Sequence, residues 1–517
     1  MAEHRVIDEK PFRIDDPARW PHYYPYLVEI YRDMERMDPG KDIVLQKSAQ
    51  GGASELAINA SIWAVDQVKA DVMYLLPTRE EATDFSAGRF NPAIEESPAL
   101  TQMFDDVSNV NHKRAGAVNY YIRGTQKRSQ LKSVPIDFLI EDEYDEMVQA
   151  NLPLAETRLD ASPLKWKLRL STPTIPEYGI NKLFLASDQR QYHVKCPHCG
   201  QWQRPTYRDN VEAQGNPPFY KCSKCGRPTN TFLLWPGEWV ATHPGRLVHG
   251  YQFTQLLSPH ITAAELVESA SKPGAEAEQE FFNSKLGEPH VVKGGQLSED
   301  ILNACREPGY KLPGIGRHCT MGVDVGKVLK VRISNWVKDG ATWHKVARYI
   351  GTVPDFGDLD RLMQQYDVDL AVVDALPETR SATAFAERHA GRVFLAYYNI
   401  PVTSKEYAIW DDDARVVRVQ RTLAMAGVME RYISRGVALP ESAEVIPDFY
   451  EQMKAPKRVL KKDERTGNPV YVFMEDGKPD HYFHAEVYDD VAGSRWIERR
   501  PADPAALAVL RGLKVHG

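Results

Sequence analysis

The chain has 517 residues, which exceeds what one hydrophobic core supports, so two to four domains are expected. Hydrophobic residues make up 43% and charged residues 26% of the chain, and neither an apolar run of bilayer length nor an N-terminal signal segment is evident, which argues against a membrane or secreted protein. The net charge of −7 excludes a generally basic nucleic-acid-binding chain, so any DNA contact must come from local clusters.

The order of patterns along the chain predicts an α/β protein built from several parts. Short apolar runs alternate with helical patterns from residue 41 to residue 190, which is typical of βαβ units around a parallel sheet. A Pro/Gly stretch near residue 313 indicates a linker, and a second strand-rich segment follows it. We therefore expect an α/β core at 1–190, a short insertion rich in Pro, Gly and Cys at 191–230, the rest of the first part and a linker at 231–312, a second α/β domain at 313–500, and a short helical tail at 501–517.

Residues 46–55, Gln-Lys-Ser-Ala-Gln-Gly-Gly-Ala-Ser-Glu, form a small-residue loop between an apolar strand pattern and a helix pattern. The loop is similar to a phosphate-binding P-loop, which normally ends Gly-Lys-Ser/Thr, but here Ala stands where the lysine is expected. A lysine at the start of the loop can bring its ammonium group to the same phosphate oxygens. The alternative is a solvated lysine at a strand end and no nucleotide site. We assign the ATP contacts to Lys47, Ser48, Gln50, Gly51, Gly52, Ala53 and Ser54, with the Ser54 hydroxyl on Mg²⁺.

Residues 135–143 supply a second element of an ATPase, an apolar strand that ends in acids. Because ligands bind at the carboxyl ends of strands in open α/β sheets, we assign Asp142 to the Mg²⁺ shell and Glu143 to the general base that polarises the attacking water. The alternative is a surface acid run that caps a strand. Residues 168–173 form a further strand that ends in Ser-Thr-Pro, and Thr172 at its tip is assigned to sensing the γ-phosphate. Together the three motifs predict an ASCE-type P-loop ATPase core at 1–190 whose remainder lies at 231–312.

These motifs resemble those of the large terminase subunit of tailed bacteriophages, in its lambda-type branch, which carries the P-loop lysine early in the loop. The similar residues run from the P-loop through 142–147, 171–174 and 286–289 into the C-terminal part of the chain. The resemblance implies an ATP-driven motor that packages double-stranded viral DNA, with an N-terminal ATPase and a C-terminal RNase-H-like nuclease that cuts the DNA. It also implies a small terminase subunit and a procapsid portal as partners, a ring when assembled, and a location in the host cytoplasm.

Two CxxC pairs, Cys196/Cys199 and Cys222/Cys225, are separated by 22 residues. Four thiolates at this spacing can close a tetrahedron around Zn²⁺, and a glycine follows each pair to allow a tight turn. A site with four cysteine ligands leaves no open coordination position, so we predict a structural zinc. The alternative is four unrelated free thiols.

In the C-terminal segment, Asp324 lies on a strand pattern, two further strand patterns and a helix pattern follow, and Asp374 ends the next strand pattern. This order resembles the RNase H fold, in which acids from the first and fourth strands meet. Two such carboxylates can hold divalent ions, Mg²⁺ or Mn²⁺, that activate water and stabilise the leaving oxygen in phosphodiester cleavage. For each acid alone, the alternative is a charge at a strand end.

The third corner of this site is expected late in the chain, where Asp480, His481 and His484 share the start of a helix pattern. Related terminases often have His-x-x-Asp here, so His484 stands where an acid is usual, and a histidine ligand favours Mn²⁺ or another transition metal. The structural alternative for Asp480 is a helix N-cap. Asp489 and Asp490 are a second candidate pair.

Two basic clusters are candidates for contacts with a phosphate backbone. One is a hairpin pattern in residues 454–473 that turns near residues 466–468. The other precedes the acidic strand and comprises Arg123, Lys127, Arg128 and Lys132.

The sequence leaves the arginine that completes the ATPase site open, with Arg79, Arg89 and an arginine from a neighbouring subunit as candidates. It also leaves two other functions open. One is a helicase-like DNA-dependent ATPase whose C-terminal domain only binds DNA. The other is a non-enzymatic zinc-ribbon protein with a decayed P-loop.

Overall fold

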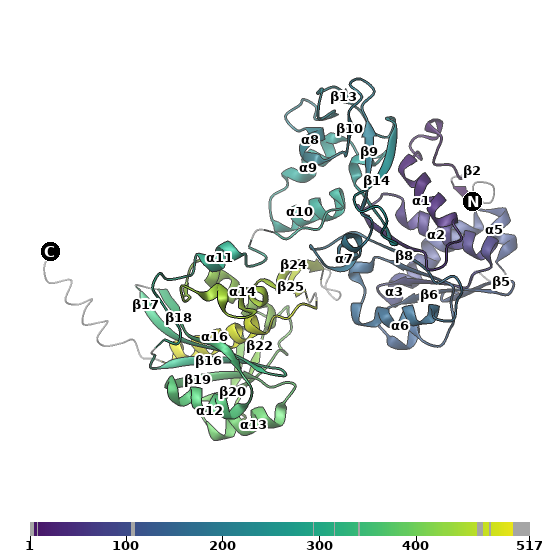
Figure 1. The fold of residues 1–517 in the computed structure, drawn as a ribbon. Coiled ribbons are helices and arrows are strands. Elements are labelled where there is room, and N and C mark those ends of the chain that lie inside the picture. Colours follow the sequence, from purple (N-terminus) through teal and green to yellow (C-terminus); the bar gives the residue numbers. More distant parts are fainter. Residues whose placement is uncertain are drawn as a thin grey trace. The chain divides into compact units, whose positions relative to one another are not determined.

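The chain folds into two compact units that divide between His290 and Val291 (Figure 1). The computed structural model describes residues 5–7, 9–104, 109–292, 294–314, 316–339, 342–462, 469–474 and 477–499. The expected tail at 501–517 and the expected hairpin turn at 466–468 lie outside the described residues. Residues 291–312, which the sequence grouped with the first part of the chain, belong to the second unit, where α11 (Glu299–Asn303) contacts α14 (Arg421–Ile433).

The first unit is built on a sheet that has ten strands in the described part of the chain. The strand order is β10-β9-β15-β3-β8-β7-β4-β6-β5, with β14 paired to β9, and the run from β9 to β6 is parallel. The strands are β3 (Asp42–Lys47), β4 (Val72–Leu76), β5 (His112–Ala115), β6 (Val118–Gly124), β7 (Phe138–Asp142), β8 (Trp166–Ser171), β9 (Arg190–Lys195), β10 (Trp202–Gln203), β14 (Gly237–Ala241) and β15 (His249–Phe253).

The position of β8 confirms the predicted ASCE arrangement. This strand lies between β3, which leads into the P-loop, and β7, which ends in the acids, so the carboxyl ends of all three strands meet at one edge of the sheet. Because side chains alternate along a strand, residues of β3 pack into two different cores. Ile43 and Leu45 belong to the core under α2 (Ala53–Trp63), and Val44 belongs to the core on the other face, under α7 (Gly179–Ala186).

The first unit also contains several short helices (Figure 1). They are α1 (Pro25–Glu35), α3 (Arg79–Phe85), α4 (Asn91–Glu95), α5 (Pro98–Met103), α6 (Leu152–Glu156), α8 (Tyr207–Asn210), α9 (Ala263–Ser271) and α10 (Ala275–Glu280). A two-stranded ribbon, β1 (Val6–Ile7) with β2 (Lys10–Pro11), precedes α1. Between β10 and β14 the chain forms a small sheet of β11 (Val211–Glu212), β12 (Phe219–Lys221) and β13 (Pro228–Thr229).

The second unit contains a sheet of eight strands among the described residues, in the order β21-β22-β20-β19-β16-β17-β18-β23. The first three strands of this unit, β16, β17 and β18, are antiparallel neighbours, and β19 pairs in parallel with β16, as expected for an RNase H fold. The strands are β16 (Cys319–Val325), β17 (Leu329–Asp339), β18 (Thr342–Val353), β19 (Val368–Asp374), β20 (Val393–Tyr397), β21 (Ala408–Asp411), β22 (Val416–Val419) and β23 (Val437–Ala438). A separate hairpin pairs β24 (Lys457–Lys462) with β25 (Pro469–Met474).

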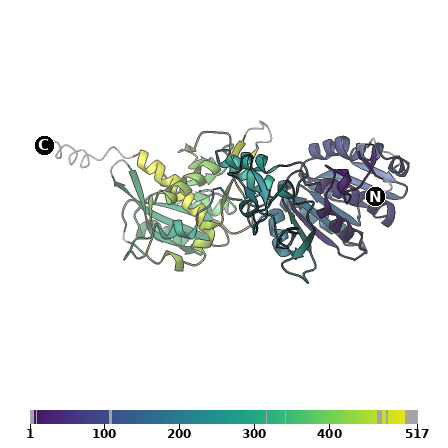
Figure 2. The same cartoon turned by 90° about the horizontal axis from the view of Figure 1, so that it is seen from above.

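Helices cover both faces of this second sheet. Leu359 of α12 (Phe356–Gln365) and Phe385 of α13 (Thr379–Arg388) pack into the core on one face. The other face is covered by α14, α15 (Phe449–Lys454) and the long α16 (His481–Glu498), which lies across β16, β17 and β19 (Figure 2). A Cβ atom on Gly322 of β16 would lie 2.1 Å from the Ala485 carbonyl oxygen of α16, so glycine sets how closely this helix approaches the sheet.

No helix in the described ranges combines the length and the apolar character needed to cross a lipid bilayer.

Candidate active sites and zinc site

The loop between β3 and α2 is built to receive an anion. Gly52 occupies the left-handed region, with φ of +78°, and is the N-cap of α2. The N–H groups of Ser48 and Ala49 donate to the carbonyls of Phe253, at 3.0 Å, and Ser284, at 2.8 Å. Among the described residues, no acceptor is bonded to the N–H groups of residues 50–54. The start of the loop is therefore anchored to the protein, while its second half presents free N–H groups at a helix N-terminus, which is the arrangement that binds phosphate.

Lys47 ends β3 and reaches the predicted general base. Its Nζ lies 2.8 Å from Oε1 of Glu143, and the Lys47 side chain is 7% exposed. Burial acts to lower the pKa of Lys47, but the carboxylates of Glu143 and Asp142 outweigh this effect and raise it above its usual value. The ammonium is therefore charged and lies beside the acids that end β7, and residues 48–55 of the loop contain no second lysine.

Asp142 and Ser54, both predicted to hold Mg²⁺, are neighbours. The Tyr74 hydroxyl donates to Asp142 Oδ2 at 2.6 Å, and the Glu143 N–H donates to Oδ1 at 3.0 Å. Burial raises the pKa of the Asp142 carboxyl, while Lys47 and the hydrogen bonds from Tyr74 and Ser54 oppose this rise. A buried carboxylate beside a hydroxyl at the first turn of α2 is a suitable donor set for Mg²⁺.

Glu143 has the backbone conformation of a constrained site residue. Its φ is +59°, in the left-handed region that residues with a side chain rarely adopt. This turn ends β7 and directs the Glu143 side chain to Lys47, while Glu141, one residue before Asp142, faces the opposite side of the sheet and is fully buried. Strand alternation and this turn give the three consecutive acids different surroundings, in line with the different roles that the sequence predicts for Asp142 and Glu143.

Asp145 connects the acidic strand to the Ser-Thr-Pro tip, and the sequence analysis gave it no role. Its carboxylate accepts the N–H of Thr174 at 2.8 Å and the N–H of Ile180 at 2.6 Å, and its own N–H donates to Ser171 Oγ at 3.2 Å. Burial raises the pKa of Asp145 to about 7, although these hydrogen bonds oppose the rise. Thr172, the predicted γ-phosphate sensor, is therefore held in a loop that is tied to the chain two residues after Glu143.

A second clamp holds the start of the P-loop. The Gly287 carbonyl accepts from the side-chain amides of Gln46, at 2.9 Å, and Gln252, at 3.2 Å. A Cβ on Gly287 would lie 2.8 Å from the Ser48 nitrogen, so no larger residue fits there without displacement. The next residue, Glu288, lies 3.5 Å from the Arg204 guanidinium of the cysteine-containing lobe. Residues 286–289, which carried part of the family resemblance, are thus in contact with the P-loop.

A cavity of about 380 Å³ opens beside Gly52 and Glu55. Its walls combine aromatic and basic side chains with apolar ones, a lining that suits a flat, polar ring. The side chains that form them include Phe12, Arg13, Arg19, Trp20, Tyr24 and Tyr31.

Of the two arginine candidates in this chain, Arg89 is close enough for its charge to act to lower the pKa of both Lys47 and Tyr74. Arg79 is the first residue of α3, and its side chain is exposed.

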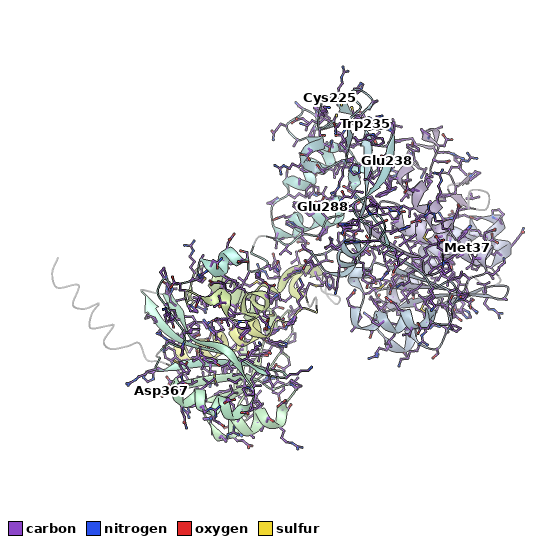
Figure 3. The ribbon with its side chains drawn as sticks, viewed as in Figure 1. Met37, Cys225, Trp235, Glu238, Glu288 and Asp367 are labelled. Atoms are coloured by element: carbon purple, nitrogen blue, oxygen red, sulfur yellow. The ribbon has the colours of Figure 1, made fainter. Side chains whose placement is uncertain are left out.

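The four predicted zinc ligands come together. The Sγ atoms of Cys196, Cys199, Cys222 and Cys225 all lie within 4.8 Å of one another, and two of the separations are 3.9 and 3.7 Å. Zn–S bonds of about 2.3 Å in a tetrahedron place sulfur atoms about 3.8 Å apart, so the cluster fits Zn²⁺. The following glycines, Gly200 and Gly226, have φ of +72° and +67°, as the tight turns require. Figure 3 shows Cys225 at the outer end of the lobe that contains β10, β13 and α8, and Glu288 at its base.

In the second unit, Asp324 and Asp374 lie on neighbouring parallel strands, one residue beyond the pair Val323 and Val373. Asp324 is 6% exposed. Burial raises the pKa of Asp374 to about 6, and the negative charge of Asp324 adds to this rise. Two carboxylates that repel each other are a site at which a divalent cation is stabilised.

The start of α16 adds to this site. His481 Nδ1 lies 2.8 Å from Asp324 Oδ2, and His484 Nε2 lies 3.3 Å from Asp480 Oδ2. Hydrogen bonding to Asp324 raises the pKa of His481. The candidate ligand atoms of this nuclease site are more widely spaced than the sulfur atoms of the zinc site. In the described ranges, only the four cysteines form a set of three or more His, Cys, Asp or Glu residues whose ligand atoms all lie within 4.8 Å of one another.

Two tyrosines support the candidate ligands, and the sequence analysis did not identify them. The Tyr398 hydroxyl lies 2.9 Å from His484 Nδ1, and its ring stacks on Tyr488 with centroids 5.6 Å apart. A hydrogen bond from Tyr488 acts to lower the pKa of Asp374. The tyrosine pair thus connects one candidate ligand on β19 to another on α16.

Asp489 and Asp490 do not lie in this site. They belong to a largely buried network in which three acids of α16 face three cations, and whose closest contacts are Lys345 to Glu486 and Arg431 to Asp490, both at 2.8 Å. Thr320 and Ser334 also donate to Asp489, each at 2.6 Å. The complete set is Arg332, Lys345, Arg431, Glu486, Asp489 and Asp490.

The two predicted basic clusters are only partly available to a ligand. In the hairpin, Lys457 is 4% exposed, and the Arg458 guanidinium lies 4.8 Å from the centre of the Tyr471 ring. In the first unit, Arg123 donates to the Gln130 carbonyl at 2.7 Å. The exposed members of that cluster are Lys127, Arg128 and Lys132.

Comparison with known proteins identifies the family. A family model described as "Phage terminase large subunit gpA, ATPase domain" matches residues 15–232, and "Terminase large subunit gpA, endonuclease domain" matches residues 248–494. The chain belongs to the gpA family of phage terminase large subunits. It carries both domains of that family in order, which favours the terminase interpretation over a helicase-like ATPase with a DNA-binding domain.

Individual relatives agree with this gpA assignment. The large terminase subunit of Escherichia phage lambda is 21% identical over 357 residues, which cover 59% of this chain and 55% of the lambda protein. The large subunit of Enterobacteria phage P21 is 22% identical over 261 residues, which cover 46% of this chain and 38% of that protein. The aligned stretch thus spans about half the length of the lambda relative. The crystal structure of the HK97 bacteriophage large terminase has the same fold, with a TM-score of 0.54 and 11% identity over 95% of this chain and 97% of that chain.

Proposed function

We propose that this gpA-family chain hydrolyses ATP to drive viral double-stranded DNA into a procapsid and cuts that DNA with a metal-dependent endonuclease. The observation that carries the proposal is the convergence of Lys47, Ser54, Asp142 and Glu143 around a loop with unbonded N–H groups. A decayed P-loop would have no reason to retain a buried, charged lysine opposite two acids.

The N–H groups of residues 50–54 would receive the β- and γ-phosphates, and Lys47 would neutralise them from the β3 side of the loop. Ser54 and Asp142 would hold Mg²⁺, which when bound supplies positive charge to the phosphate oxygens. Because Lys47 is paired with Glu143, its transfer to the phosphates frees the Glu143 carboxylate to accept a proton from the attacking water. We infer that the aromatic cavity beside Gly52 receives the adenine ring, and that Arg89 approaches the phosphates.

In the endonuclease domain, Asp324 and Asp374 would hold the Mg²⁺ or Mn²⁺ ions that activate water for phosphodiester cleavage. His484, kept in place by Tyr398, would complete the site together with Asp480 or His481. A nitrogen ligand in place of an acid favours Mn²⁺. The exposed residues Lys127, Arg128 and Lys132 and the hairpin of β24 and β25 would contact phosphates without reading bases.

We also propose a small terminase subunit and the procapsid portal as partners, ring assembly at the portal, and action in the host cytoplasm. These follow from family membership. Because the ring would form only at the portal, a monomeric chain in isolation is compatible with this proposal.

The first test replaces Lys47 with Ala in the full chain and measures ATP turnover with and without linear double-stranded DNA. We expect a loss on the order of a hundredfold or more, because no lysine at position 53 can take over. Lys41→Ala is the matched control, because Lys41 immediately precedes the same strand, β3, but its Nζ donates to the Met34 carbonyl. Unchanged turnover in Lys47→Ala would show that the nucleotide site is assigned to the wrong residues.

The second test separates the two activities. Asp324→Asn and Asp374→Asn should abolish plasmid nicking in Mn²⁺ while ATP turnover persists, because the two acids lie in the second unit. Asp413→Asn, an exposed acid of the same unit, is the control. Nicking that survives both substitutions would reject the nuclease assignment and restore the DNA-binding alternative.

A further inference from the structure

The cysteine-containing lobe carries an excess of positive charge that its fold does not use. Between residues 195 and 229 there are six Lys or Arg residues and two acids, in a chain whose net charge is −7. Two of the six are engaged, because Lys221 pairs with Glu212 at 2.6 Å and Arg204 approaches Glu288. Among the described residues, the other four have no acidic partner; they are Lys195, Arg208, Lys224 and Arg227.

Three of these cations flank the cysteine turns in the chain, and the fourth lies on a helix that is bonded to one of those turns. Lys195 immediately precedes Cys196, and Lys224 immediately precedes Cys225, and these two cysteines have Sγ atoms 3.9 Å apart. The helix that carries Arg208 is joined to the second cysteine turn, since Asn210 donates to the Lys221 carbonyl at 3.0 Å. All four side chains are exposed. Trp202, which is 38% exposed, lies 5.8 Å from Lys195 Nζ and places an aromatic face beside the cations.

Some of these cations can have a structural role, which is to stabilise the negative charge of the metal centre. Four thiolates and one Zn²⁺ carry a formal charge of −2, and nearby cations can stabilise that charge. Gln203 already donates to Cys222 Sγ at 3.4 Å, and backbone N–H groups surround the same thiolate. Two cations would balance the metal centre, so four exposed cations leave positive charge for an external ligand.

We propose that the outer end of the zinc ribbon, formed by Lys195, Arg208, Lys224 and Arg227, binds the phosphate backbone of duplex DNA. This inference rests on the proposed function, in which ATP hydrolysis by this domain moves duplex DNA. Separated exposed cations on a rigid, metal-closed scaffold suit an evenly spaced polyanion better than an acidic protein segment, which would require matched pockets for its side chains.

The lobe is also connected to the P-loop by a series of side-chain contacts. Arg204 contacts Gln252 at 3.2 Å and Glu288 at 3.5 Å, and the carbonyl of the adjoining Gly287 is bonded to Gln46 at the end of β3. DNA held at the outer end of the ribbon is therefore connected to the nucleotide loop through a short chain of contacts within one unit. This gives DNA binding a physical means to alter ATP turnover.

The experiment measures binding of a fluorescent 40-base-pair duplex to the full chain at several salt concentrations, without divalent ions. Two variants are compared with the wild type: Lys224→Ser with Arg227→Ser, and Lys195→Gln with Arg208→Gln. The matched control, Lys182→Ser with Lys272→Ser, removes two exposed cations from α7 and from the end of α9. Zinc content and release to a chelator are measured on each protein.

Each cation that neutralises a phosphate contributes about 0.9 to the slope of log affinity against log salt, so either ribbon pair should lower the slope by about two. Affinity at about 0.1 M salt should fall on the order of tenfold, while the control retains the wild-type slope and zinc release stays unchanged. Wild-type slopes in both ribbon pairs would overturn the inference, as would faster zinc release with unchanged DNA binding, which would assign the cations to the metal. If the wild type itself shows no salt-dependent DNA binding, the proposed function fails instead.

Discussion

Replacement of Asp145 by Asn tests whether this chain sacrifices stability for a working ATPase site. The buried carboxylate has a pKa raised from 3.8 to about 7, so at pH 8 its charge is held in the fold at a cost. A shift of about three units corresponds to about 4 kcal/mol, which is an upper bound because local water and relaxation reduce it. The neutral amide carries no such charge, but it leaves one of two backbone N–H groups without an acceptor, which costs about 1–3 kcal/mol. Asp145→Asn should therefore be more stable than the wild type at pH 8 by about 1–3 kcal/mol.

The pH dependence follows from linkage. Because the folded-state pKa of Asp145 lies above its unfolded value, the folded chain binds more protons between about pH 4 and pH 7, and wild-type stability falls as pH rises through that window. The Asn variant lacks this contribution. The stabilisation of the Asn variant by loss of this charge should therefore be small near pH 4 and largest at pH 8, as measured by urea unfolding of the first unit.

The same substitution should lower the rate of ATP hydrolysis. An amide offers one acceptor in place of two, so the N–H of Thr174 or of Ile180 loses its partner and the loop that carries Thr172 shifts. We expect kcat for ATP to fall on the order of tenfold with a smaller change in KM. The exposed residue Asp160, changed to Asn, is the control. A variant that is less stable than the wild type at pH 8, or that keeps full kcat, would refute this reasoning.

Three further predictions concern the buried network, the nuclease site and the zinc site. Lys345→Met leaves three buried carboxylates facing two cations and should lower the free energy of unfolding of the second unit by about 3–5 kcal/mol in urea; a loss below about 1 kcal/mol would argue against a tightly coupled network. Tyr398→Phe removes the hydroxyl that holds His484 and should weaken Mn²⁺ binding about tenfold in a paramagnetic-resonance titration, whereas wild-type affinity would mean that the tyrosine only packs. Cys222→Ser should abolish the bound zinc and lower the melting temperature of the first unit; full zinc occupancy in that variant would disprove a four-thiolate site.

Local patterns predicted the parts of the sites that are short in sequence. The strand, loop and helix around Lys47 and Ser54, the acids after β7 and the two cysteine pairs each lie within one stretch of chain, so their spacing alone implies their geometry. The RNase H order also followed from local patterns, because three consecutive strands and one crossover specify it. The fold class was therefore predictable from the sequence, and the structure confirms it.

The residues that support these sites were not predictable, because their partners are distant in sequence. Asp145 gains its role only when β8 lies beside β7, and Tyr398 only when α16 lies over β19. Asp324 and Asp489 are both acids on apolar elements, yet the first borders the open end of the sheet and the second faces a buried lysine. Since α16 is buried almost all round, its sequence has no polar stripe to show which acids face the site.

The network of six charges around α16, of which all but Arg431 are buried, has an evolutionary consequence. Loss of any single member leaves an odd charge in the core, which costs about 3–5 kcal/mol and is a large part of the 5–15 kcal/mol that stabilises a typical domain. Replacement of the whole set by apolar residues of similar size is often tolerated, but it requires several simultaneous substitutions. Descendants of this chain are therefore expected to inherit the network as a unit, so its co-occurrence in a diverged sequence would mark common descent more reliably than overall identity.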